Sequence, residues 1–207
     1  EMHIYFFDKN PAWVKEIKKK NNLDDFYQFE GVHYMTNIFN TLMEKKLPEP
    51  YYFISPSNSN GSMLGGLDLA YLRMDYQLED KLKKKIHDTS SFTSPYSDNK
   101  ILPVGASVIV PFMKNSFIIS SPTMEKQGTD VSNTNNAYRS MIASLTMMEH
   151  RFKNEGTLWV PGLCTNVGKM GYDKSSDQVL QAFKDSKEKK YPSGIASVDS
   201  FMYFNEY

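Results

Sequence analysis

The chain has 207 residues, of which 40% are hydrophobic, 14% aromatic and 23% charged. This composition supplies enough apolar side chains for a packed core, and the length fits a single domain over residues 1–207. The 24 basic and 24 acidic side chains cancel to a net charge of zero, so the overall field gives no reason to expect general nucleic-acid binding.

The sequence also disfavours a metal site, a disulfide-bonded fold and a membrane protein. One cysteine excludes an internal disulfide and a cysteine-rich zinc site, and the four histidines show no metal-ligand spacing. We therefore expect no metal and no cofactor. No apolar run reaches membrane-spanning length, and the N-terminus lacks the basic segment and apolar core of a signal peptide, which predicts a cytoplasmic or nuclear protein with no membrane partner.

Strand-like and helix-like segments alternate along most of the chain. The assignments rest on apolar runs bounded by proline or polar turns for the strands, and on apolar spacing of three and four residues for the helices. In chain order we predict a strand at 3–7, a helix at 11–20, a strand at 26–34, a strand at 51–54, a helix at 67–86, a loop at 89–100, strands at 107–112 and 117–121, a helix capped at 134–136 and reaching 152, a strand at 157–160, a helix around 179–183, a charged tail from 184 and a last edge strand at 197–204.

This alternation predicts an α/β fold of three α-β-α layers with a mixed, largely parallel central sheet. The exception is the pair 107–112 and 117–121, which is close enough in sequence to be antiparallel.

The stretch 51–70 carries the first functional signal. A buried strand at 51–54 runs into small polar residues, then Gly61 and the pair Gly65-Gly66, and a helix follows. This order places free backbone amides and the positive end of a helix dipole at the carboxyl edge of a sheet, where phosphates bind readily.

A second junction of the same kind follows the strand at 157–160, in the loop 161–171. Two such loops on neighbouring strands would flank one crevice, and two sets of amides suit a diphosphate better than a single phosphate. Neither loop carries the glycine-lysine-serine/threonine ending of nucleoside triphosphatases or the three-glycine dinucleotide motif, so those two classes are disfavoured.

The order of these pieces resembles the macro domain, a family that binds ADP-ribose, and in particular its phage-like variant. The resemblance spans about residues 4–183. It rests on the segments Ile54-Ser55-Pro56-Ser57-Asn58-Ser59, Gly65-Gly66-Leu67-Asp68-Leu69-Ala70, Pro103-Val104-Gly105-Ala106, Ile118-Ile119-Ser120-Ser121-Pro122 and Val160-Pro161-Gly162-Leu163-Cys164-Thr165.

The resemblance implies a site between the two loops. It places Asn58 against the distal ribose, the first glycine pair against the diphosphate and distal ribose, and an adenine acceptor at Asn37. It further implies that Asn58 and Asp68 would act in any catalysis, Asp68 by polarising a water or stabilising ribosyl charge. The ligand-binding residues so implied are Asn37, Ile38, Ser57, Asn58, Gly65, Gly66, Leu67, Thr165, Asn166, Val167 and Gly168.

Each implied residue also has a purely structural interpretation, and three positions depart from the family. Asn58 would equally cap a turn, and Asp68 suits a helix start on dipole grounds alone. Asn37 stands where the family has an aspartate, while Asn166 and Lys169 stand where glycine is preferred. Asparagine tolerates a left-handed backbone, so we expect Asn166 to preserve the shape of the second loop.

Three functions follow from the resemblance. The first is binding of ADP-ribose or of an ADP-ribosylated protein or nucleic acid. The second is a metal-independent ADP-ribosyl hydrolase that uses the same site. The third is a structural or interaction module with a degenerate site. Three aromatic residues are candidates to stack on adenine: Phe39, Tyr172 and Tyr203.

Overall fold

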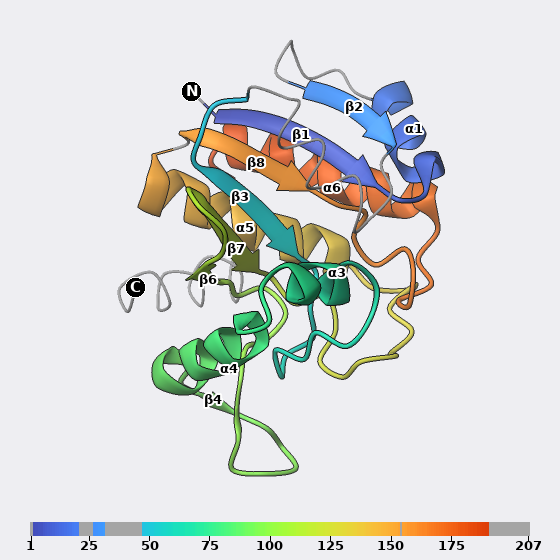
Figure 1. Ribbon diagram of the computed structural model, residues 1–207. Helices are drawn as coiled ribbons and strands as arrows, with labels where there is room; N and C mark the ends of the chain where they lie inside the picture. Colours follow the sequence, from blue (N-terminus) through green and yellow to red (C-terminus); the bar gives the residue numbers. More distant parts are fainter. Residues whose placement is uncertain (1, 21–26, 32–46, 154, 191–207) are drawn as a thin grey trace.

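The computed structural model describes residues 2–20, 27–31, 47–153 and 155–190. Its centre is one sheet, formed by β1 (Met2–Asp8), β2 (Tyr27–Gly31), β3 (Tyr51–Ser55), β6 (Val108–Pro111), β7 (Ser116–Ser120) and β8 (Gly156–Val160). The spatial order is β2-β1-β8-β3-β7-β6 (Figure 1). The first five strands in this order run parallel, and β6 is antiparallel to β7. The sheet is therefore mixed and largely parallel, as the sequence predicts.

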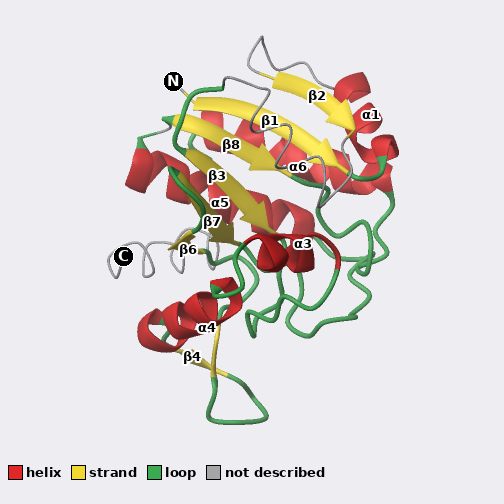
Figure 2. Cartoon of the chain, in the orientation of Figure 1, coloured by secondary structure: helices red, strands yellow, loops and turns green. Residues whose placement is uncertain are grey.

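Helices pack on both faces of the sheet, which gives the three predicted layers. They are α1 (Pro11–Lys20), α3 (Gly66–Met74), α4 (Leu78–Thr89), α5 (Asn136–Phe152) and α6 (Tyr172–Lys187). Buried side chains of α1, α5 and α6 join one apolar cluster, and those of α3 and α4 join a second cluster on the opposite face. In Figure 2, α1, α5 and α6 lie behind the sheet, and α3 lies in front of it at the end of β3.

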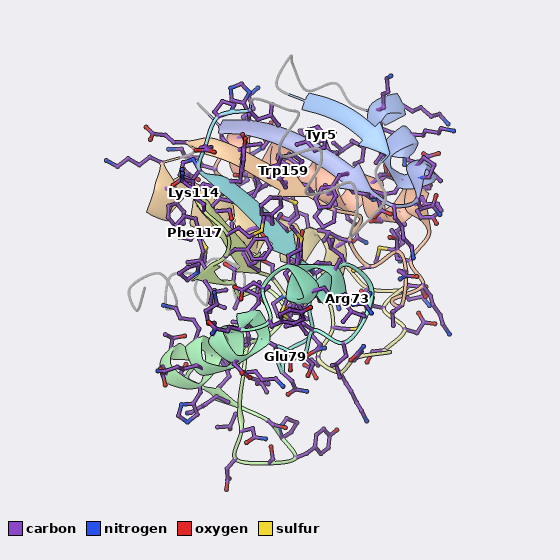
Figure 3. All side chains as sticks on the ribbon, viewed as in Figure 1. Tyr5, Arg73, Glu79, Lys114, Phe117 and Trp159 are labelled. Atoms are coloured by element: carbon purple, nitrogen blue, oxygen red, sulfur yellow. The ribbon has the colours of Figure 1, made fainter. Side chains whose placement is uncertain are left out.

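Each strand contributes side chains to both clusters, because successive side chains of a strand point to opposite faces of the sheet. In β1, Ile4 and Phe6 pack toward α1, α5 and α6, whereas Tyr5 and Phe7 pack toward α3 and α4. Tyr5 lies directly opposite Trp159 of β8, with 4.4 Å between the ring centroids (Figure 3). Every strand that ends near the site is thus fixed by packing on both sides.

The predicted helix over 67–86 is two helices in the structure. Asp75 ends α3, and its carboxylate accepts a 3.0 Å hydrogen bond from the amide of Gln77. The amide of Leu78 then donates to the carbonyl of Asp75, and α4 begins. The apolar spacing did not reveal the break because both helices bury side chains in the same cluster.

Two other expectations differ from the structure in the described residues. The predicted loop 89–100 contains a short strand, β4 (Phe92–Thr93), that pairs antiparallel with β5 (Lys100–Ile101). The charged segment predicted as a tail from Lys184 still belongs to α6 as far as Lys187. The predicted edge strand at 197–204 lies outside the described residues.

Candidate functional site

A pocket of about 160 Å³ lies at the carboxyl ends of four adjacent parallel strands, β1, β8, β3 and β7. This edge of a parallel sheet is where open α/β folds bind ligands, because strand ends and helix N-termini meet there. The pocket is lined by Asp8, Lys9, Asn10, Pro56, Ser57, Asn58, Ser62, Gly65, Gly66, Leu67, Asp68, Thr123, Met124, Gln127, Gly162, Cys164, Thr165, Asn166, Val167, Gly168 and Tyr172. Every described residue that the resemblance implied for ligand binding is in this set, whereas Asn37 and Ile38 lie outside the described residues.

The first loop is shaped by the Asn58 side chain. Its Oδ1 accepts hydrogen bonds from the amides of Asn60 and Ser62, at 3.1 and 3.2 Å, and its Nδ2 donates to the carbonyl of Ser62 at 3.3 Å. Asn58 therefore closes a turn, which was its structural interpretation. An amide group has two N–H donors, and the described residues supply an acceptor for one of them, so one donor is left for a ligand.

The N-terminus of α3 faces the pocket without a side-chain cap. The first amides of a helix lack acceptors within the helix, and in α3 the first intrahelical bond is donated by Leu69 to the carbonyl of Gly65. No group in the described part of the chain accepts a bond from the amides of Gly66, Leu67 or Asp68. Three donors and the positive end of the helix dipole thus point at the pocket.

A second row of free donors lies on the loop after β8. Within the described ranges, the amides of residues 165–168 have no protein acceptor. The loop is held from outside: the amide of Gly162 donates to Asp8 Oδ2 at 3.0 Å, and the Ser175 hydroxyl donates to the carbonyl of Leu163 at 2.6 Å. A loop held by such bonds keeps its amides pointing at one position, which lowers the cost of ordering when an anion binds.

The backbone of this second loop corrects one expectation. Asn166 does not adopt a left-handed conformation; the positive φ angles fall on Cys164, at 66°, and Lys169, at 61°. Cys164 is buried, and burial raises the pKa of its thiol to about 12, so the thiol is protonated and unreactive at neutral pH. Cys164 therefore contributes packing and loop shape.

Asp68 is a buried carboxyl group at the edge of the pocket. It lies in the first turn of α3, is 8% exposed, and accepts a 2.5 Å hydrogen bond from the Ser55 hydroxyl. Burial raises the pKa of Asp68 to about 7, and the bond from Ser55 offsets only part of that effect. A carboxyl group that titrates near neutral pH can exchange a proton with a bound ligand or water.

Two walls of the pocket were missed by sequence reasoning. One is the end of β1, with Asp8, Lys9 and Asn10. The other is the loop after β7, with Met124 and Gln127. The signal that could have found them is the shared direction of the strands, because the carboxyl ends of parallel neighbours meet at one edge.

Of the three aromatic candidates for adenine stacking, Tyr172 lines the pocket. Its hydroxyl accepts a 2.5 Å hydrogen bond from the Asn10 side chain. Phe39 and Tyr203 lie outside the described residues.

Comparison with solved structures gives the fold its name. No family model and no curated protein sequence matches this chain. The macrodomain of Mycobacterium tuberculosis DarG superposes with a TM-score of 0.53 at 16% identity, covering 68% of this chain and 84% of that one. The Oceanobacillus iheyensis macrodomain with ADP gives 0.53 at 16% identity over 77% and 84%, and a point variant with ADPR gives 0.51 at 15% over 75% and 83%.

The protein has the macrodomain fold. At this identity the likeness establishes the fold, and function must be argued from the site. Among the described residues, no group of three or more histidine, cysteine, aspartate or glutamate side chains is placed to hold a metal ion. No helix in that part of the chain combines the length and apolarity needed to cross a bilayer.

Proposed function

We propose that this protein binds ADP-ribose, or the ADP-ribosyl group of a modified protein or nucleic acid, in the pocket between its two glycine-containing loops. One observation carries the proposal. The free amides of the α3 N-terminus and those of residues 165–168 line the same pocket, and the space for a Cβ on Gly66 is 3.8 Å from the Asn166 side chain. Two converging sets of donors suit the four non-bridging oxygens of a diphosphate that joins two sugars.

The shape of the pocket supports a long ligand with its phosphates in the middle. The lining comes from the ends of four neighbouring strands. Strands are spaced about 4.8 Å apart, so the pocket extends over roughly 14 Å along the sheet edge. The amide-rich loops follow β8 and β3, the two central strands, while the ends of β1 and β7 provide polar walls on either side. A nucleoside and a second sugar joined by a diphosphate match this layout.

The charge of the pocket supports recognition by dipoles rather than by cations. Lys9 is the one basic side chain among the described lining residues, and it is exposed. Backbone amides carry no net charge, so phosphate binding to them lacks the charge pairing with lysine or arginine that releases the counter-ions of a nucleic acid. We therefore expect affinity that depends only weakly on salt, in contrast to nucleic-acid binding through basic patches.

The solved structures add support of a different kind. The Oceanobacillus iheyensis macrodomain, which has the same fold, has been solved with ADP and, as a point variant, with ADPR, and this supports the choice of ligand class. Because the identity is near 16%, the transfer to this chain rests on its own amides and pocket.

Replacing Gly65 tests the proposal without straining the backbone. Gly65 has an extended conformation, with φ −151°, and a Cβ there would meet just the flexible end of Gln127, at 3.3 Å. In Gly65→Asp, the new carboxylate would cap α3 and occupy the amides itself, so we expect calorimetric binding of ADP-ribose to be lost while thermal stability is kept or slightly raised.

Gly65→Ala is the matched control, because it adds the same Cβ without an oxygen that could cap α3. We expect it to bind ADP-ribose at least tenfold more tightly than Gly65→Asp. Equal affinities for the two variants would show that the anion does not sit on the α3 N-terminus. A folded wild-type protein that fails to bind at millimolar ADP-ribose would overturn the proposal and favour the structural or interaction module.

A second candidate function, hydrolysis of an ADP-ribosyl bond, is favoured by one observation: Asp68, whose buried carboxyl group has a pKa of about 7, is one of the residues that line the pocket. Such a group can donate a proton to a leaving group or accept one from water at neutral pH. Hydrolysis of an ADP-ribosylated protein whose rate changes with an apparent pKa near 7, and is lost in Asp68→Asn with ADP-ribose binding retained, would support it. Binding without turnover would reject it.

A further inference from the structure

We infer that Gln127, on the loop after β7, contacts the group that the diphosphate carries at its distal end, and so makes the pocket select ADP-ribose over ADP. This inference deepens the proposed function and rests on it. Gln127 was absent from the residues that the sequence implied. Its loop forms a third wall of the pocket, on the side of β3 that faces away from β8.

Backbone bonds fix this third wall to the first loop. The amide of Thr123 donates to the carbonyl of Ser57 at 3.0 Å, and the amide of Ser59 donates to the carbonyl of Met124 at 3.1 Å. These bonds extend the pairing of β3 and β7 beyond the sheet, and Asn58 and Met124 form a parallel bridge. Gln127 therefore projects from a segment whose position relative to the pocket is set by the fold.

Two independent features point to the Gln127 carboxamide as a ligand contact. First, it is exposed at the pocket and has no hydrogen-bond partner among the described residues, so its donors and acceptor are available. Second, its Nε2 lies 3.3 Å from the space for a Cβ on Gly65, next to the free amides of α3. Gly65 has an ordinary backbone conformation, so the absence of a side chain there keeps this space open rather than relieving strain.

The chemistry of the carboxamide indicates what it recognises. A glutamine side chain both donates and accepts, which matches vicinal hydroxyl groups on a sugar, whereas the diphosphate offers acceptors that the amides already serve. Gln127 lies on the same side of the anion site as Asn58, because Asn58 pairs with Met124 of the Gln127 loop, and both residues line the pocket. This inference puts the base at the other end of the pocket, where the lining comes from the end of β1 and from Tyr172. The ligand class is thus a nucleoside diphosphate that carries a second hydroxylated sugar.

The test compares two ligands that differ in this sugar. Calorimetric titration of the wild-type protein and Gln127→Ala with ADP-ribose and with ADP should show a three- to tenfold loss of ADP-ribose affinity in the variant, and ADP affinity within twofold of wild type. Because the side chain is exposed and unpaired, the thermal midpoint should not change. Glu125→Ala, a change in the same loop outside the pocket lining, should leave both affinities unchanged.

The outcomes separate the two proposals. If both ligands bind and Gln127→Ala weakens them equally, or weakens neither, then Gln127 does not read the distal sugar and this inference is wrong while the proposed function stands. If the folded wild-type protein binds neither ligand, the proposed function fails and this inference fails with it.

Discussion

The two glycine-containing loops present amides to the same pocket, but they use glycine for opposite reasons. In the first loop, Gly61 and Gly66 have positive φ angles of 73° and 56°, so glycine supplies the conformation. In the second loop, the positive φ angles belong to Cys164 and Lys169. Of the glycines in that loop, Gly168 has an ordinary backbone, and a Cβ on it would lie 2.8 Å from the carbonyl oxygen of Cys164.

This difference shows that the role of a glycine in such a loop depends on its φ angle and on the space around its Cα, and cannot be assigned from the sequence alone. The first loop would be strained by any side chain at Gly66, whatever the space. The second loop already carries strain at two positions and relies on tight packing at a third. The first loop also leads to a buried carboxyl group of its own, Asp68, whereas residues 161–171 contain no acidic side chain and are held by the carboxylate of Asp8 at the end of β1. Substitutions in the two loops should therefore have different signs and sizes.

The largest expected effect comes from Asp68, next to the first loop. Its folded pKa of about 7 lies above the unfolded value of 3.8, so the folded state holds a proton that the unfolded state releases. Its contribution to stability is present below pH 3.8 and is lost as the pH rises toward 7, on the order of 4 kcal/mol across this range. In Asp68→Asn, this loss should disappear, because the amide does not titrate and still accepts from Ser55.

Denaturant unfolding of both proteins at several pH values between 4 and 8 measures this effect. The free energy of unfolding of Asp68→Asn should increase steadily relative to that of the wild type as the pH rises. If the free energies of unfolding of the two proteins depended on pH in the same way, Asp68 would not be held in a desolvated site. The two loops would then no longer differ by a buried, protonated carboxyl group.

The next effect concerns packing in the second loop. In Gly168→Ala, the added Cβ would meet Val131 Cγ2 at 2.7 Å and the backbone of Cys164 at 2.8 Å, and backbone cannot move aside cheaply. We expect a loss of about 2–3 kcal/mol in the free energy of unfolding. Gly171→Ala is the matched control, since nothing lies within 4 Å of its Cβ, and it should change stability by less than about 0.5 kcal/mol. A tolerated Gly168→Ala would mean that this loop relaxes more than its contacts imply.

The smallest expected effect is an increase in the free energy of unfolding, at Lys169 in the second loop. Lys169 is exposed and has a φ of 61°, which costs an L-residue about 1 kcal/mol. Lys169→Gly should raise the free energy of unfolding by about 0.5–1 kcal/mol, whereas Lys169→Ala, which removes the same charge without relieving the backbone, should not. If both variants change stability equally, charge rather than conformation governs this position.

Most of the fold was predictable because strands and helices differ in apolar period. The uninterrupted apolar run of β1, which is buried on both faces of the sheet, and the spaced apolar residues of α5 gave the right elements and the right layers. The break between α3 and α4 was not predictable from that period, since both helices bury the same face. It depends on hydrogen bonds at Asp75 that the spacing does not contain.

The two predicted loops do line one pocket, because each follows a central parallel strand. The Gln127 wall was missed for a definite reason. The strand 117–121 was interpreted as half of an antiparallel pair, and its parallel pairing with β3, which brings its end to the pocket, was not considered. The left-handed positions were also misplaced, since Asn166 is the residue type that best tolerates that conformation and yet Cys164 and Lys169 adopt it.

The position of β1 inside the sheet has a consequence for how the chain folds. The first strand pairs with β8, so Met2 lies opposite Gly156, and Asp8 holds the amide of Gly162 across 154 positions of sequence. Contacts between residues so far apart in sequence form slowly, because closing the long intervening segment costs entropy before the contacts compensate for it. During synthesis, β1 must therefore wait until the segment that follows β8, 154 positions after Asp8, has been made. The end of the pocket built by Asp8 and the second loop should accordingly be the last part of the molecule to form.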